Sequence, residues 1–207
     1  MDLFSKFRNR EQAPPPQNRK QGLFRDFDVI YVFVAFMLVY VLLFRVVVVT
    51  GDSMNQTLLD GDMLLLASNT IYHNPRQGDI IVASKDSFRD GECIVKRVIA
   101  TEGQLVDIDF ERRIVYVDGQ PLEESYAFFA PDDHNAMSQH GIVFPQTVPE
   151  SCVFVMGDNR NDSLDSRSPA IGFIDEREIL GKAIILFFPG TDEGNVPRDY
   201  DRIGGLN

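Results

Sequence analysis

The sequence predicts a mainly β protein, in which one N-terminal apolar helix precedes an all-β domain of the sandwich or barrel type. An uncharged run of sixteen residues, VIYVFVAFMLVYVLLF, fills positions 29–44. Beyond it, short apolar runs alternate with clusters of Gly, Pro, Asn and Asp, the pattern of short strands joined by turns. A composition of 44% hydrophobic and 25% charged residues is typical of globular proteins. The length of 207 residues leaves room for one ordinary domain.

The charge is spread unevenly along the chain. The net charge of -11 excludes a nucleic-acid binder, which would need a basic face to meet phosphate. Residues 1–28 carry six basic and four acidic side chains, a net +2, so that everything after them holds -13. Three consecutive prolines at 14–16 among Gln and Asn indicate that residues 1–28 are a polar tail.

Residues 29–45 are predicted to form a transmembrane anchor. Sixteen helical residues span about 24 Å, and continuing the helix through Val49 gives about 31 Å, close to the thickness of a hydrocarbon core. Arg45 at the far end can reach the interface. A cleaved signal peptide would have a shorter apolar run and a small-residue cleavage site, and a buried core helix remains the other alternative. The basic tail favours a cytoplasmic N-terminus at the cell membrane, with residues 46–189 forming an extracytoplasmic domain.

The domain after the anchor reads as a succession of strands. Val46–Val49 is β-branched and suits a strand better than a helix end. Ile114–Val117 and Gln120–Leu122, joined by Asp-Gly, predict a hairpin. The other predicted strands are Met63–Ala67, Ile80–Ala83, Glu92–Ala100, Gln104–Asp109, Val153–Met156 and Lys182–Phe188.

The remaining segments are less regular. Residues 123–150 hold His, Pro, Asp and Asn together with the aromatic patch 126–130, and predict a loop-rich lobe inserted in the sheet. Asp175–Leu180 suggests a short helix, and the polar, Gly-containing residues 190–207 a mobile C-terminal tail. An extracytoplasmic setting would permit a Cys93–Cys152 disulfide, although sequence does not give the distance between them.

Three motifs can carry chemistry. Ser53 follows the valine run in Gly51-Asp52-Ser53-Met54, where a serine alone is most often a turn hydroxyl. Lys96 and Arg97 are adjacent in an apolar strand and point to opposite faces, so at least one is expected in apolar surroundings. Burial would lower the pKa of a lysine there and let it take a proton from a serine, unless the strand lies at an edge and both cations are solvated.

The third motif is the polar loop GDNRNDSLDSR at residues 157–167. Its density of aspartate, arginine and serine suits a loop locked by ion pairs, although a solvated turn has the same composition. Taken in this order behind one apolar span, the three motifs resemble those of bacterial type I signal peptidases. The resemblance covers roughly residues 29–188 and implies a membrane-bound Ser–Lys endopeptidase that cleaves signal peptides from exported precursors, with small residues before the cleavage site.

The resemblance also implies individual roles. Ser53 matches the nucleophile, Lys96 the general base, and Ser163 the serine that orients the lysine. Met54 lies where the family has a residue lining the substrate pocket. Asp158 with Arg97, and Asp165 with Arg167, resemble structural ion pairs, and no metal or cofactor is implied.

Two positions depart from the commoner family pattern. Gly51 stands where some members have a serine that adds an oxyanion donor, which leaves the second donor open. Gln56 replaces a frequent proline.

His73, His134 and His140 belong to none of the motifs. A self-cleaving repressor-type protease would need a DNA-binding module, and a catalytically silent tethered domain remains an alternative that the intact serine–lysine set disfavours.

Overall fold

The computed structural model describes residues 19–85, 91–130, 137, 141–191 and 198–206. The predicted polar tail up to residue 18, His134 and His140 lie outside these residues. The chain divides into two compact units, Met1–Tyr40 and Val41–Asn207.

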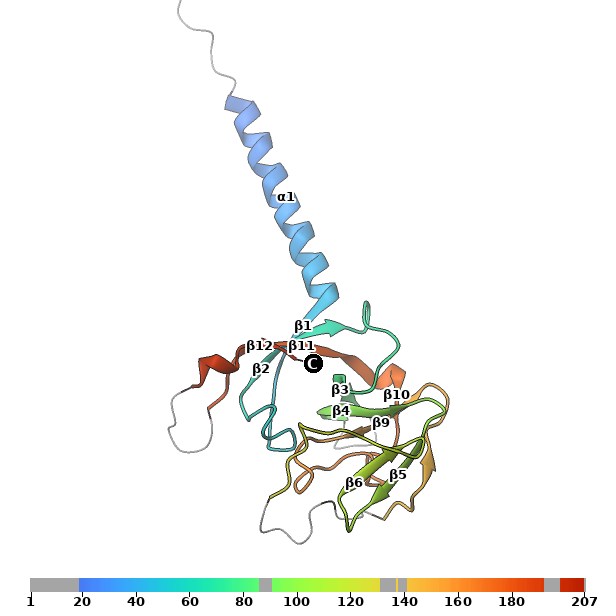
Figure 1. The fold of residues 1–207 in the computed structure, drawn as a ribbon. Coiled ribbons are helices and arrows are strands. Elements are labelled where there is room, and N and C mark those ends of the chain that lie inside the picture. The colour runs from blue at the N-terminus through green and yellow to red at the C-terminus, as the bar shows by residue number, and fades with distance from the viewer. Residues whose placement is uncertain (1–18, 86–90, 131–136, 138–140, 192–197, 207) are drawn as a thin grey trace, which may run out of the picture. The chain divides into compact units, whose positions relative to one another are not determined.

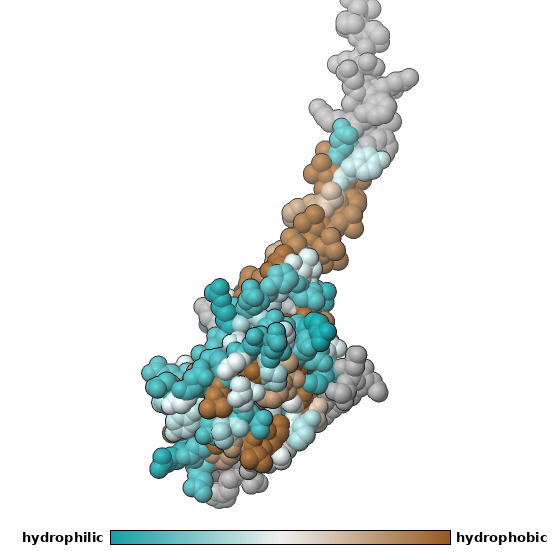
Figure 2. Space-filling view, turned by 90° about the vertical axis from the view of Figure 1, so that its right-hand side faces the viewer, coloured by the Kyte–Doolittle hydropathy of each residue, from teal (hydrophilic) through white to brown (hydrophobic). Residues whose placement is uncertain are grey.

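The first unit consists mainly of helix α1, Arg19–Leu43. From residue 28 to residue 42 every side chain is exposed, and Figure 2 shows the apolar surface that they present. Within the described part of the chain, none of the helices combines the length and the hydropathy needed to span a bilayer. The helix ends two residues before the predicted end of the anchor, because Phe44–Val48 forms strand β1 and includes Arg45.

The second unit contains two antiparallel sheets, and the predicted mainly β class is confirmed (Figure 1). An eight-stranded sheet runs in the order β1-β2-β11-β3-β4-β9-β10, with β12 paired to β11, and a four-stranded sheet runs β7-β6-β5-β8. The remaining strands are β2 Met63–Ser68, β3 Ile80–Ser84, β4 Cys93–Thr101, β5 Leu105–Asp109, β6 Ile114–Val117, β7 Gln120–Pro121, β8 Gln146–Thr147, β9 Cys152–Met156, β10 Ile174–Asp175, β11 Ile179–Phe188 and β12 Gly204–Gly205.

Side-chain burial alternates along β2 and shows which face of the large sheet packs into the core. In β2 the side chains of Leu64, Leu66 and Ser68 are buried while their neighbours are half-buried, as a period of two requires. One core cluster combines Leu64 and Leu66 with Met54 and Leu58 from the loop between β1 and β2. The core of the sheet therefore fixes the loop that carries Ser53.

The predicted helix at 175–180 is wrong in type and extent. Only Glu176–Glu178 is helical, as a single 3-10 turn capped by Asp175, and β11 begins at Ile179. Ile179, Gly181 and Ala183 are buried in alternation, so the segment follows the period of a strand. The strand consequently starts three residues before the predicted Lys182.

The C-terminal segment 198–206 is not the mobile tail that the sequence predicted. Strand β12 pairs with β11 through Ile185 and Gly205, and Leu206 N–H donates to Ile184 C=O at 3.0 Å. A 3-10 turn, η3 Tyr200–Arg202, precedes that strand. Long-range polar contacts of single residues, which leave no periodic signal in the sequence, hold this segment on the domain.

Cys93 and Cys152 are free thiols, so the permitted disulfide is absent. The register of β4 and β9 gives the reason. Thr101 at the far end of β4 pairs with Val153, which places Cys152 beside that end while Cys93 begins the strand. Eight residues of strand separate the two ends by roughly 25 Å, far beyond the reach of a disulfide.

Candidate active site

Ser53 lies on a closed loop between β1 and β2. Val49 N–H donates to Asp62 C=O at 2.8 Å, and Gly61 N–H donates to Val49 C=O at 2.9 Å, so the two ends of the loop meet. Met54 is 1% exposed and anchors the loop in the core beside Ser53. Gly51 has a φ of +82°, a conformation that favours glycine, which accounts for glycine at this position.

Strand β4 brings Lys96 to this loop. Its Nζ lies 2.6 Å from Ser53 Oγ and donates to Val95 C=O at 2.9 Å. Only 4% of Lys96 is exposed, and Arg97 on the opposite face of the strand is 2% exposed. Both cations are therefore buried, and the alternative of a solvated edge strand is wrong because β4 lies between β3 and β9.

Burial lowers the pKa of Lys96 from 10.5 to about 8. The loss of solvation is the largest cause, and the positive charge of Arg167 acts in the same direction, while Asp165 and Asp158 oppose it. An amine with this pKa is neutral in a substantial fraction of molecules slightly above neutral pH. It can then accept the proton of the hydroxyl beside it.

The loop at 157–167 packs behind Lys96 around a buried carboxylate. Arg167 donates to Asp165 through Nε at 2.8 Å and Nη2 at 2.8 Å, and both side chains are fully buried. Gly157 N–H donates to the same carboxylate at 3.0 Å. Ser163 Oγ donates to Asp165 Oδ2 at 2.7 Å, and the hydrogen bonds of Lys96 among the described residues go to Ser53 and Val95. The carboxylate is thus held on several sides, and these partners keep its pKa low despite its burial.

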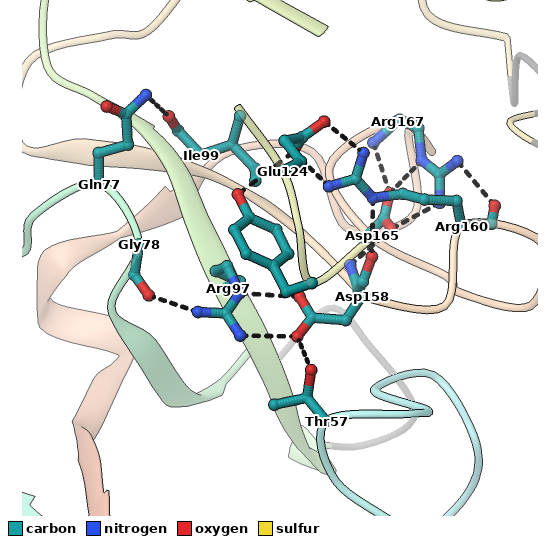
Figure 3. Close-up of polar contacts among 12 residues, drawn as sticks. Thr57, Gln77, Gly78, Arg97, Ile99, Glu124, Asp158, Arg160, Asp165 and Arg167 are labelled. Atoms are coloured by element: carbon teal, nitrogen blue, oxygen red, sulfur yellow. Dashed lines mark hydrogen bonds and ion pairs between the residues drawn. The ribbon is translucent and has the colours of Figure 1, made fainter. Parts of the chain in front are cut away.

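A second buried ion pair joins β4, the loop and the Ser53 segment (Figure 3). Arg97 donates to Asp158 through Nε at 2.8 Å and Nη2 at 2.7 Å, so that both carboxylate oxygens are engaged. Thr57 Oγ1 donates to Asp158 Oδ2 at 2.6 Å. The ion pairs that the resemblance implied, Asp158 with Arg97 and Asp165 with Arg167, are both present.

The 157–167 loop also forms hydrogen bonds with the main chain at Asp52 and Ser53. Asn159 N–H donates to Ser53 C=O at 3.1 Å, and Asn159 Nδ2 donates to Asp52 C=O at 3.1 Å. A Cβ at Gly157 would lie 2.3 Å from Ser53 O and 2.2 Å from Ser163 Oγ. Glycine at 157 is therefore required for the loop to approach Ser53 this closely.

A cleft of about 520 Å³ opens beside Ser53 and Lys96. Its walls are residues 47–54 on one side, 92–96 on the other, and Asp162 and Leu164 from the loop. The first wall includes part of β1, which is an edge strand of the large sheet. The cleft can accept an extended chain along that edge and bring one of its carbonyls to Ser53.

Sequence reasoning missed several residues that build this site. Arg160 is 1% exposed and forms a bidentate ion pair with Glu124 of the inserted lobe. The ring of Tyr126 lies 4.0 Å from the Arg97 guanidinium. Asn159 and Arg160 belong to the recognised 157–167 motif, which was their signal in the sequence. Glu124 had no such signal, and Tyr126 was noted only as part of an aromatic patch.

Of the three histidines, only His73 is among the described residues, and it lies in a separate pocket beside Tyr72 and Glu176. At the end of β11, Leu186 is buried whereas Phe187 and Phe188 are exposed. In the described ranges, no group of three or more His, Cys, Asp or Glu is placed to hold a metal ion.

Comparison with known families matches residues 25–188 to the family described as signal peptidase, peptidase S26. A probable signal peptidase I-1 of Synechocystis is 38% identical over 155 residues, which cover 72% of this chain and 73% of that protein. A signal peptidase I of Bacillus licheniformis is 32% identical over 176 residues, covering 83% and 92% of the two chains. A signal peptidase I structure from Enterococcus faecalis is 28% identical, covers 53% of this chain and 97% of that one, and gives a TM-score of 0.41.

Proposed function

Because the chain belongs to the signal peptidase family, peptidase S26, and is a serine endopeptidase that cleaves signal peptides, we propose that Ser53 and Lys96 are its catalytic dyad. The observation that carries the proposal is the 2.6 Å contact between Lys96 Nζ and Ser53 Oγ beside an open cleft. The lowered pKa of Lys96 supplies a base that works near neutral pH.

The reaction follows from this geometry. Neutral Lys96 takes the Ser53 proton while Ser53 Oγ bonds to the carbonyl carbon of the scissile peptide. The resulting ammonium gives that proton to the leaving amine, the C–N bond breaks, and an acyl-enzyme ester forms. Lys96 then removes a proton from water, whose oxygen attacks the ester, and the proton returns to Ser53 Oγ as the ester bond breaks. The Ser53 backbone N–H is one donor to the oxyanion in both halves.

We assign the neighbouring residues to support and recognition. Met54 lines the cleft next to Ser53, and Val47 and Val48 of β1 offer a strand edge to an extended precursor segment. The precursor is proposed to carry small residues just before the scissile bond. Ser163 holds Asp165, the carboxylate that most favours the charged form of Lys96, and Arg97, Asp158 and Arg167 keep the surrounding loop rigid.

We also propose that residues 29–45 anchor the enzyme in the cell membrane, with the N-terminus cytoplasmic and the catalytic domain outside. The apolar run and the +2 charge before it support this topology. Ser53 is eight residues past Arg45, so the chain keeps it within about 30 Å of the bilayer. Alkaline extraction of membranes tests the anchor: the full chain should stay in the pellet, and recovery in the supernatant would contradict it.

The dyad is tested with purified protein in detergent and a precursor that carries an Ala-x-Ala site. Ser53→Ala and Lys96→Ala should each abolish processing while the far-UV circular dichroism stays that of the wild type. Arg177→Gln, which changes an exposed ion pair away from the cleft, is the control and should process normally. Near wild-type cleavage by either dyad variant would overturn the assignment.

A further inference from the structure

The C-terminal segment 198–206 lies beyond residues 25–188, which match the family, yet one of its side chains reaches the base of the Ser53 loop. Arg202 donates to Asp62 through Nη1 at 2.9 Å and Nη2 at 2.6 Å, and Nη2 also donates to Thr57 C=O at 3.3 Å. Asp62 and Thr57 lie 140 and 145 residues before Arg202 in the sequence. Arg202 therefore bonds to two points of the loop that carries the nucleophile.

Asp62 is the residue through which the loop closes. Its side chain is fully buried and accepts Leu59 N–H at 2.7 Å and Gly190 N–H at 2.6 Å. Its carbonyl accepts Val49 N–H at 2.8 Å. A buried carboxylate without its guanidinium would keep its desolvation cost and lose its main counter-charge. The geometry of the loop end thus depends on Arg202.

A series of polar contacts links Arg202 to the strand that carries Lys96. Thr57, whose carbonyl Arg202 contacts, donates its hydroxyl to Asp158 at 2.6 Å, and Asp158 is the partner of Arg97 on the strand that carries Lys96. Ser53 lies between Val49 and Thr57 in this loop. Movement of the loop relative to β4 would lengthen the Lys96–Ser53 contact.

We propose that Arg202 is a positioning residue that clamps the Ser53 loop against β4 from the C-terminal segment; this inference rests on the proposed role of Ser53. The segment is docked independently of the clamp. Arg198 Nη1 donates to Pro189 C=O at 2.6 Å, its guanidinium lies 4.6 Å from the Phe188 ring, and β12 pairs with β11. Loss of the Arg202 contacts should therefore loosen the loop without releasing the segment.

The test measures precursor cleavage by the full chain in detergent with Arg202→Gln, Arg202→Lys, Arg198→Gln and Arg177→Gln. Arg202→Gln should lower kcat by about tenfold to a hundredfold with KM within twofold, because a displaced nucleophile affects the transition state more than binding. Arg202→Lys keeps the charge and should recover part of the loss. Arg198→Gln removes a docking contact of the same segment, and Arg177→Gln removes a bidentate pair elsewhere; both should keep the wild-type kcat.

The proposed positioning role of Arg202 is wrong if Arg202→Gln keeps the wild-type kcat. It is also wrong if Arg198→Gln lowers kcat as much as Arg202→Gln does. If Arg202→Gln does not fold, Arg202→Lys decides: a lower kcat at unchanged KM supports the clamp, and a wild-type kcat overturns it. Ser53→Ala, measured alongside, separates the two proposals. Residual activity there would refute the nucleophile, whereas an inactive Ser53→Ala with a wild-type Arg202→Gln would refute the clamp alone.

Discussion

Lys96 combines two properties that are in tension. Its burial costs stability in the charged form, and the same burial makes it a base near neutral pH. Two aspartates nearby oppose the shift without contacting the amine, so the pKa of Lys96 falls only to about 8. The environment therefore tunes the lysine between a permanently charged and a permanently neutral side chain.

The pH dependence of catalysis should report this tuning. Below pH 8 the folded enzyme holds Lys96 as an ammonium, which cannot take the Ser53 proton, so kcat/KM should rise with pH through a midpoint near 8. Initial rates of peptide cleavage between pH 6 and 10 measure it. A midpoint close to the free lysine value of about 10.4 would show that burial does not tune this base.

Stability should respond to the same group. The unfolded chain keeps the lysine proton up to about pH 10.5, whereas the folded chain releases it near pH 8. The unfolded state binds more protons in this window, so the free energy of unfolding of the wild type should rise with pH between the two values. Below pH 8 the buried charge costs roughly 3 kcal/mol.

Lys96→Met should remove that cost. Urea unfolding at pH 7 is expected to show a more stable variant, with the difference shrinking as the pH rises from about 8 to 10.5. Ser53→Ala keeps the lysine and should follow the pH dependence of the wild type. An Lys96→Met variant that is less stable than the wild type at pH 7 would mean that the ammonium is well compensated in the fold.

At the scale of elements, the site depends on how closely the 157–167 loop approaches the Ser53 loop. Gly157→Ala would place a Cβ 2.3 Å from Ser53 O and 2.2 Å from Ser163 Oγ, and the main-chain neighbour cannot rotate away. The loops must separate, so we expect at least a hundredfold lower kcat/KM. Gly204→Ala is the matched control, since a Cβ there meets nothing within 4 Å. Equal activity of the two variants would refute the close-approach argument.

The elements differ in how far sequence predicts them. Strands such as β2 and β4 were predictable because each is a short, mainly apolar run bounded by turn residues in the sequence. Lys96 and the ion-paired loop were found through motifs. By contrast, the contacts Glu124–Arg160, Thr57–Asp158 and Arg202–Asp62 join single polar residues 36, 101 and 140 positions apart, and such pairings leave no periodic signal. The predicted short helix failed because Asp175 caps only one turn before the strand period resumes.

At the scale of the molecule, the chain separates its two proposed tasks into two units. The apolar helix belongs mainly to the unit ending at Tyr40, whereas the dyad, both sheets and all three core clusters lie in Val41–Asn207. The charge divides in a similar place, with +2 on the first 28 residues and -13 on the rest. Anchoring and chemistry should therefore be separable by truncation.

A fragment of residues 41–207 should fold and cleave an Ala-x-Ala peptide with kcat/KM within about tenfold of the full chain, because it retains every contact around Ser53 and Lys96. The comparison fragment 50–207 lacks β1. That strand covers the β2 edge over five paired residues and lines the cleft, and Val49, also lost, closes the Ser53 loop. We expect this shorter fragment to be inactive and aggregation-prone, since its β2 edge is uncovered. Circular dichroism, light scattering and peptide cleavage measure the difference, and an active 50–207 fragment would show that neither β1 nor the Val49–Asp62 closure is needed to place the nucleophile.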